Sequence, residues 1–167
     1  MASRFSLVLH VRLYLVQHGE AKKEEEDPAR PLTDEGFRDC VKVAKYISGL
    51  NIRVKKVFHS GKLRAKQTAE VYAEYLKPEE GVMETDGLKP LAETKLWVER
   101  AGTIGEDAMV VGHLPQLSKL TSALIIEDES REVIRFRNAG VVCLERDEQG
   151  KWRILWAITP KTISGSG

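Results

Sequence analysis

Short apolar runs, rich in β-branched residues, alternate with segments of helical periodicity through most of the chain. The run VRLYLVQ at 11–17 is typical of a buried strand, and comparable runs lie at 54–60, 82–86 and 107–113. Strands that alternate with helices favour a mostly parallel sheet with helices on both faces. The sequence therefore predicts an α/β fold with three layers, α/β/α.

Three helices are expected between and after these strands. The first begins after Thr33, whose hydroxyl is a good N-cap, and ends at Gly49. The second follows the strand-like run at 54–60 and ends before Pro78, because the residue preceding a proline disfavours the helical conformation. The third follows the run at 107–113.

The end of the chain changes character. Three further strand-like runs lie at 132–138, 140–147 and 151–159, with a turn between the last two. These runs predict that the central sheet is mixed rather than purely parallel. We expect one domain over residues 1–160 and a flexible tail at 161–167, where small and polar residues gather.

The charge balance gives no electrostatic reason to expect nucleic acid or a membrane as a partner. Lys+Arg 26 against Asp+Glu 25 gives a formal net charge of +1. No apolar run has the length of a membrane span. Cys40 and Cys143 lie far apart and suit buried positions in a reduced protein. We therefore expect a cytoplasmic protein with unpaired cysteines.

Polar residues follow three of the expected strands at the point where each strand ends. His18 and Gly19 follow the first strand, Arg64 lies one turn into the helix after the second, and His113 ends the fourth. Ligands of such sheets bind at the carboxyl ends of the strands, near a switch in strand order. These side chains are therefore expected to line one shallow pocket. His59 also ends a strand, and we interpret it as a neighbour rather than a catalyst.

This set of residues suits phosphoryl chemistry. A neutral imidazole is a nucleophile toward phosphorus when one ring nitrogen is held by a hydrogen bond and the other is free. The planar guanidinium of Arg64 can bind two phosphoryl oxygens, and the amide of Gly19 could point at a third. His113, once protonated, could donate to the same group. Each residue alone is commonly structural, but together they predict a site for phosphate or another anion.

Five motifs occur in one order between residue 13 and about residue 124: LYLVQHGEA, RPLTDEG, SGKLRAKQTAE, LKPLAE and VVGHLPQL. Taken together, they resemble the histidine phosphatase superfamily, whose members share a phosphoglycerate-mutase-like fold, and most of all its SixA-type phosphohistidine phosphatases. The resemblance implies that His18 becomes phosphorylated, that Arg64 binds phosphate and that His113 is the second pocket histidine. It also implies that Arg30 lies near the mouth of the site as a weaker phosphate or substrate contact.

The resemblance also suggests a residue that could protonate the leaving group. Larger relatives use an acidic residue to protonate the leaving oxygen, and Glu93 lies in about the corresponding region. Little chain separates the third and fourth strands, so we expect no lid over the site. The four histidines lack the spacing of metal ligands and the cysteines do not supplement them, so neither a metal nor a cofactor is expected.

Gln17 departs from the pattern of the family, which has arginine before the histidine. A glutamine can donate hydrogen bonds to a phosphate oxygen, but it brings no charge. The expected loss is roughly 1 kcal/mol, or about tenfold in phosphate binding or rate. Loss of the cation should also raise the pKa of His18 and reduce its nucleophilic form. Nearby cations that could compensate are Lys22, Lys23 and Lys62.

Three functions remain open from the sequence. The first is a phosphatase in signal transduction that removes phosphate from a phosphohistidine on a partner protein, such as a phosphocarrier or a phosphotransfer domain, and that is weakened by Gln17. The second is a phosphatase for small phosphate esters, which would need an acid such as Glu93. The third is a non-catalytic module that binds phosphate or phosphohistidine.

Overall fold

A computed structural model describes residues 10–163, which form a single sheet covered on both faces. The six strands are β1 Val11–Gln17, β2 Lys56–His59, β3 Val82–Glu84, β4 Ala108–Gly112, β5 Val141–Arg146 and β6 Trp152–Ile158, in the order β3-β2-β4-β1-β5-β6. The first four strands by position are parallel, whereas β5 and β6 are antiparallel to their neighbours. The predicted mixed sheet is confirmed.

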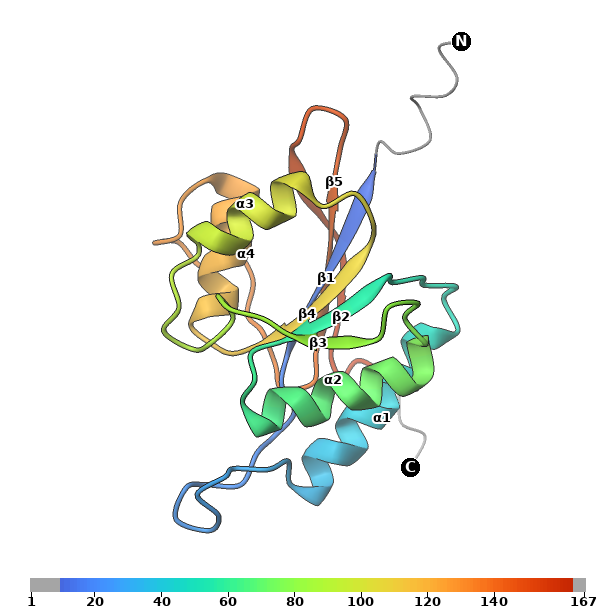
Figure 1. The fold of residues 1–167 in the computed structure, drawn as a ribbon, viewed down its shortest axis with the longest axis vertical. Coiled ribbons are helices and arrows are strands. Elements are labelled where there is room, and N and C mark those ends of the chain that lie inside the picture. Colours follow the sequence, from blue (N-terminus) through green and yellow to red (C-terminus); the bar gives the residue numbers. More distant parts are fainter. Residues whose placement is uncertain (1–9, 164–167) are drawn as a thin grey trace.

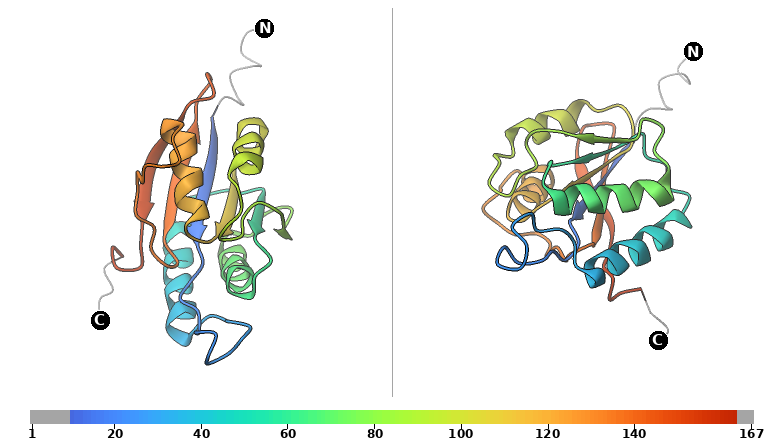
Figure 2. Two further views of the ribbon diagram at one scale, coloured as in Figure 1. Left: turned by 90° about the vertical axis from the view of Figure 1, so that its left-hand side faces the viewer. Right: turned by 60° about the horizontal axis from the view of Figure 1, so that its bottom comes forward.

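Two pairs of helices enclose this sheet. They are α1 Asp34–Ser48, α2 Leu63–Leu76, α3 Lys95–Thr103 and α4 Gln116–Ile126. Figure 1 and the two views of Figure 2 show α1 and α2 on one face of the sheet and α3 and α4 on the other. The expected three-layer α/β/α architecture is therefore confirmed.

The alternation of side chains along each strand divides the apolar core into two. In β1, Tyr14 and Val16 pack with the buried residues of α1 and α2. Leu13 and Leu15 point to the other face and pack with those of α3 and α4. Because β1 is buried on both faces, its sequence is an almost unbroken apolar run.

Local signals set the ends of the two helices that flank the candidate site. The hydroxyl of Thr33 accepts a hydrogen bond from the amide of Gly36, 2.9 Å away, and so caps α1, which ends at the C-cap Gly49. α2 ends at Leu76, just ahead of Pro78, and Lys77 takes the left-handed conformation at its C-cap. All three predicted boundaries are confirmed.

One expectation about the second half of the chain was wrong, and one helix there was not predicted. No strand forms over 132–138. This segment instead packs beside the core, where it buries Phe136. In addition, α3 was not expected; only Trp97 and Ala101 of this short helix are buried, which is too weak a periodicity to detect.

Three other expectations concern the cysteines, membrane-spanning helices and the C-terminal tail. Cys40 and Cys143 are both buried free thiols, as predicted. Within residues 10–163, no helix has the length and apolar character needed to cross a membrane. Of the tail expected at 161–167, residues 164–167 lie outside the part that the structure describes, as do residues 1–9.

Candidate active site

The strand order brings the ends of β1 and β4 together. These strands are parallel neighbours in which Gln17 is paired with Gly112, and the amide of His18 donates to the carbonyl of Gly112 at 3.1 Å. The residues that follow the two strands are therefore side by side. The ring centroids of His18 and His113 lie 4.9 Å apart. The pairing of these imidazoles follows from a crossover that no local pattern specifies.

The tautomer of His18 is fixed by its own neighbour. Its Nδ1 lies 2.7 Å from the carbonyl oxygen of Gly19, and because a carbonyl can only accept, Nδ1 must carry the hydrogen. The lone pair on Nε2 is left for chemistry. Burial lowers the pKa of His18 to about 4, against the opposing effect of the Gly19 bond and with a further lowering by Arg64 and Arg30. His18 is thus neutral near pH 7.

This state of His18 bears on Gln17. We expected the missing arginine to reduce the neutral form, but burial and two other cations, Arg64 and Arg30, keep the pKa well below neutrality. The glutamine therefore does not deprive His18 of its nucleophilic form near pH 7. Its effect on phosphate binding is a separate matter.

His113 is the most enclosed member of the site, with 1% of its surface exposed. Its Nε2 lies 2.6 Å from the hydroxyl oxygen of Ser60, at the end of β2. Burial, together with the smaller effects of His18, Arg64, Lys62 and Arg30, lowers the pKa of His113 to about 3. His113 is therefore neutral near pH 7, and its donation to phosphate once protonated stays a prediction.

Two arginines supply the positive charge of the pocket. Arg64 stands in the first turn of α2, and its Nε is a buried donor that bonds to no atom of residues 10–163. Arg30 has a φ of 51°, an uncommon value for a residue with a side chain, and its Nε donates to the carbonyl of Lys22 at 3.0 Å. Arg30 is close enough to lower the pKa of both imidazoles. Arg30 thus keeps an unfavourable backbone conformation beside the nucleophile, which is common at functional positions.

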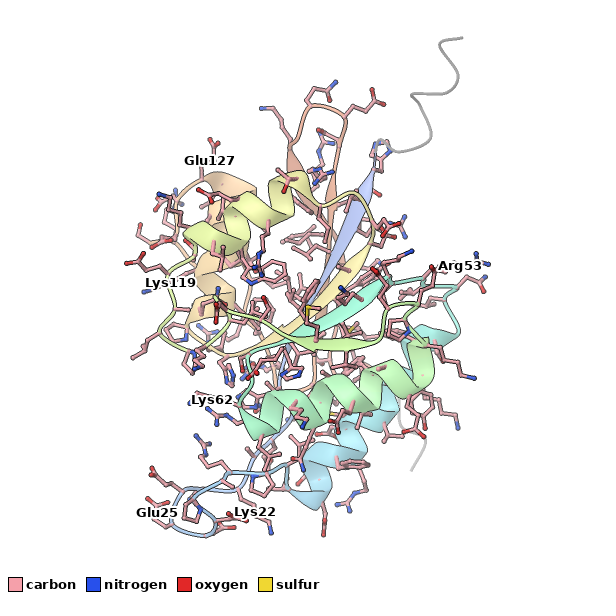
Figure 3. All side chains as sticks on the ribbon, viewed as in Figure 1. Lys22, Glu25, Arg53, Lys62, Lys119 and Glu127 are labelled. Carbon is pink, nitrogen blue, oxygen red and sulfur yellow. The ribbon has the colours of Figure 1, made fainter. Side chains whose placement is uncertain are left out.

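Of the three lysines that could replace the missing charge, Lys62 is the one that acts on a pocket histidine. It precedes α2 and is among the cations that lower the pKa of His113, whereas Lys22 and Lys23 are not. Figure 3 shows Lys62 beside the N-terminal end of α2, and Lys22 with Glu25 on the projecting loop between β1 and α1.

Thr68 connects the nucleophile to α2, and sequence reasoning missed it. Its hydroxyl accepts from the amide of Gly19 at 2.9 Å and donates to the carbonyl of Arg64 at 2.8 Å. Thr68 thus accepts from the amide that we expected to point at a phosphate oxygen, and a contact of Gly19 with phosphate stays a prediction. Gly19 is required for another reason: a Cβ there would lie 2.7 Å from the sulfur of Cys40. The threonine of LRAKQT was the available signal.

The RPLTDEG segment is fastened to the same structure and so positions Arg30. The amide of Leu32 donates to the side chain of Gln67 at 2.8 Å, and the amide of Thr33 donates to the carbonyl of Glu20 at 2.9 Å. α1 approaches so closely that a Cβ on Gly36 would lie 2.1 Å from the same carbonyl oxygen. Leu32, Thr33 and Gly36 of this motif therefore each have a contact that holds the segment in place.

Three buried polar atoms around His18 have no hydrogen-bond partner among residues 10–163. They are Gln17 Oε1, Arg64 Nε and His113 Nδ1. Buried polar groups are nearly always paired, so a cluster of exceptions calls for an explanation. Arg64 Nε is a donor beside a neutral imidazole and a second guanidinium group, which suits an oxyanion, whereas Gln17 Oε1 can only accept a hydrogen bond and adds nothing to such a site.

The acidic side of the site is less defined. Glu93 is exposed and lines a hollow of about 460 Å³ with Gly87 and Glu99, and no hydrogen bond within residues 10–163 joins it to either imidazole. Its role as an acid stays a prediction. Ser60 borders a different hollow of about 350 Å³, together with two carboxylates that sequence reasoning missed, Glu84 and Asp86.

His59 has a structural contact, and the described residues include no metal-binding group. The Nδ1 of His59 accepts from the amide of Gly61 at 3.0 Å, so this buried imidazole holds the turn that leads to α2. Over the described part of the chain, no three or more His, Cys, Asp or Glu side chains are grouped so as to hold a metal ion.

Comparison with known proteins decides the family. The model of the histidine phosphatase superfamily (branch 1) matches residues 13–96, which include His18, Arg30 and Arg64. The chain belongs to the histidine phosphatase superfamily. Its second pocket histidine, His113, lies beyond the matched segment, in the half of the chain where the sequence signal is weaker.

Relatives extend the likeness of this histidine phosphatase chain to most of its length. It is 23% identical to the phosphohistidine phosphatase SixA of Escherichia coli (strain K12) over 155 residues, 90% of this chain and 94% of that protein. It is 31% identical to an uncharacterized protein of Picosynechococcus sp. over 142 residues, 80% of this chain and 84% of that protein. Among solved structures, the histidine phosphatase SixA complexed with tungstate aligns with a TM-score of 0.82 at 22% identity, covering 92% of this chain and 99% of that one. A phosphoglycerate mutase of Plasmodium falciparum also aligns, with a TM-score of 0.69 at 17% identity over 89% of this chain and 90% of that one, which confirms the phosphoglycerate-mutase-like fold.

Proposed function

We propose that this chain is a phosphohistidine phosphatase that acts on a partner protein through a phosphorylated His18. The observation that carries the proposal is the state of His18: a neutral imidazole whose Nδ1 hydrogen is held by Gly19 and whose Nε2 is free beside Arg64 and His113. Membership of the histidine phosphatase superfamily supports the use of this imidazole as a nucleophile toward phosphorus.

In the first step, Nε2 of His18 attacks the phosphorus of the substrate and the bond from phosphorus to the leaving group breaks. When the leaving group is a phosphohistidine ring whose other nitrogen is protonated, it departs as neutral imidazole and needs no strong acid from the protein. The guanidinium groups of Arg64 and Arg30 stabilise the charge on the phosphoryl oxygens.

In the second step, water attacks the phosphorus and the bond to Nε2 breaks. Phosphorylation leaves His18 cationic because Nδ1 keeps its hydrogen, so the ring can depart as neutral imidazole while water passes a proton to the phosphate formed. The carbonyl of Gly19 holds that hydrogen throughout. One hydrogen bond therefore serves both halves of the reaction.

A partner protein is the proposed source of the phosphohistidine. The similarity to SixA, a phosphohistidine phosphatase by name, supports this substrate class. Leu63 and Leu114 adjoin the site residues Arg64 and His113 in the chain, and 36% and 38% of their surfaces are exposed. Exposed apolar side chains beside a phosphate pocket suit contact with a protein surface. We propose a phosphocarrier or phosphotransfer domain of a cytoplasmic signalling system as this partner.

A phosphatase of small phosphate esters is the second candidate. An alkoxide is a poor leaving group, so this activity needs a proton donor. The carboxylates of Glu84 and Asp86 share a hollow with Ser60, whose hydroxyl contacts His113, and they are therefore candidates for the proton donor in addition to Glu93. A module that only binds phosphate is disfavoured, since the nucleophile is neutral and free.

The test is the release of phosphate from a phosphohistidine-bearing carrier protein, measured beside p-nitrophenyl phosphate with wild type and His18→Ala. We expect release from the carrier to be rapid, slow from the ester and lost in the variant. Rapid release from the ester alone would favour the second candidate. No release from either, with tungstate still bound, would overturn the enzymatic proposal in favour of a binding module.

A further inference from the structure

Ser60 is a buried hydroxyl at the carboxyl end of β2, with 2% of its surface exposed. Besides the 2.6 Å contact of its oxygen with Nε2 of His113, it accepts a hydrogen bond from the amide of Lys62 at 3.3 Å. Since β2 and β4 are parallel neighbours, the end of one strand supports the residue at the end of the other. Ser60 opens the motif SGKLRAKQTAE, but the proposed reaction gives it no role.

Counting donors and acceptors decides the direction of this hydrogen bond. The hydroxyl of Ser60 has one hydrogen, and Nε2 of His113 is its only hydrogen-bond acceptor among residues 10–163. If Nε2 donated instead, the buried hydroxyl hydrogen would have no acceptor, which costs free energy. The satisfied arrangement has Ser60 donating to Nε2, so the hydrogen of the neutral ring lies on Nδ1.

We infer that Ser60 is a positioning residue that fixes His113 as the neutral Nδ1–H tautomer, a hydrogen-bond donor for the phosphoryl group at His18. Nδ1 is the ring atom that is buried without a partner among the described residues. An N–H at this atom turns an unexplained buried group into a donor beside the nucleophile. The use of this donor in catalysis rests on the proposed function, whereas the tautomer itself does not.

The two imidazoles of the site then have opposite roles imposed by opposite partners. A carbonyl takes the Nδ1 hydrogen of His18 and leaves a lone pair at Nε2. A hydroxyl occupies the Nε2 lone pair of His113 and leaves a hydrogen at Nδ1. One ring is presented as a nucleophile and the other as a donor, and neither has to change its protonation state when an anion arrives.

The charges around His113 agree with a neutral donor. The groups that face it are His18 from β1, Arg64 and Lys62 from α2 and its cap, and Arg30 from the loop before α1. All of them disfavour a second hydrogen on the ring. A neutral N–H is therefore the form in which this imidazole can donate without adding a further positive charge.

The tautomer is tested by nitrogen NMR of protein labelled with ¹⁵N-histidine, at mildly alkaline pH, in wild type, Ser60→Ala and Ser60→Thr. We expect the Nδ1–H form for His113 in wild type and in Ser60→Thr, which keeps the hydroxyl. Ser60→Ala should show a mixture of both tautomers. An Nε2–H ring in wild type, or an unchanged Nδ1–H ring in Ser60→Ala, would overturn the inference. The wild-type spectrum decides even where a variant fails to fold.

The donor is tested by tungstate affinity in a matched pair, His113→Asn and His113→Gln. The amide nitrogen of asparagine can take the place of Nδ1, whereas that of glutamine reaches the place of Nε2. We expect His113→Asn to bind tungstate roughly three- to tenfold more tightly than His113→Gln. Equal affinities would contradict a donor at Nδ1. Because tungstate binding and the tautomer do not require turnover, a lack of phosphatase activity would count against the proposed function alone.

Discussion

The two sides of the candidate site are built in different ways. On the side of β1 and α2, side chains bond to the backbone at nearly every step, as Thr68 does to Gly19 and Gln67 does to Leu32. On the side of α3 and α4, Leu91 in the loop before α3 is 88% exposed, and the hydroxyl of Thr94 bonds to the exposed side chain of Glu129. The first side fixes geometry, and the second leaves surface open.

This contrast matches the expected division of labour in a phosphotransfer site. The phosphoryl group is the same in every substrate, so the residues around it gain from a rigid frame. The leaving group differs between substrates, and the open side is where it would lie. The family match over residues 13–96 covers all of the rigid side and little of the open one.

Exchanging one threonine on each side tests the contrast most strongly. Thr68→Val removes the acceptor of the Gly19 amide, and a buried donor left unpaired costs about 1–3 kcal/mol. We expect a loss of about that size in the free energy of unfolding and a 10- to 100-fold loss in the rate of phosphate release. Denaturant unfolding and steady-state kinetics measure the two effects.

The matched control on the open side is Thr94→Val. Thr94 bonds to the exposed side chain of Glu129, which water can satisfy instead. We expect its rate of phosphate release to stay within about twofold of wild type, since this hydrogen bond holds no residue of the candidate site. Similar losses in both variants would show that the two sides are equally rigid, and the contrast would fail.

The rigid side should also carry a dependence of stability on pH. The pKa of His18 is about 4 in the folded protein and about 6.5 in the unfolded chain, so the unfolded state binds more protons between these values. Stability is therefore full above the unfolded pKa and falls as pH drops toward the folded one. We expect His18→Gln to reduce the slope by up to about 1.4 kcal/mol per pH unit, measured by urea unfolding between pH 6.5 and 5. Parallel slopes in wild type and variant would mean that His18 is not buried as neutral imidazole.

Gln17→Arg sharpens the contrast by adding a cation to the rigid side. A charged donor is worth about 1 kcal/mol more than a neutral one, so we expect tungstate to bind about tenfold more tightly. Gln17→Met, similar in size and without a donor, serves as the control and should weaken binding. If arginine and glutamine bound tungstate equally, the missing charge would already be supplied by Arg30 and Arg64.

The contrast between the two sides also explains what could be predicted from the sequence. β1, α1 and the placement of His18 and Arg64 depend on local signals such as an apolar run, the Thr33 cap and the RPLT and LRAKQT motifs. Thr68 and Ser60 were missed because their contacts join residues that are 49 and 53 positions apart. The alternation of 132–138 predicts a strand, but the segment packs beside the core instead, and whether a strand-like run pairs depends on long-range packing that the sequence does not display.

Glu93→Gln gives the smallest expected effect and tests the open side directly. An imidazole leaving group needs no acid, and Glu93 is exposed, so we expect phosphate release from a phosphohistidine protein to change less than about twofold. Glu99→Gln, a second exposed carboxylate on the same hollow, is the matched control. The rate of release from p-nitrophenyl phosphate should also stay unchanged in both variants, because an aryl oxide is a good leaving group. An alkyl phosphate is the substrate whose hydrolysis requires a proton donor. A loss confined to Glu93→Gln on the alkyl ester would identify this residue as the acid and would place the open side within the catalytic machinery after all.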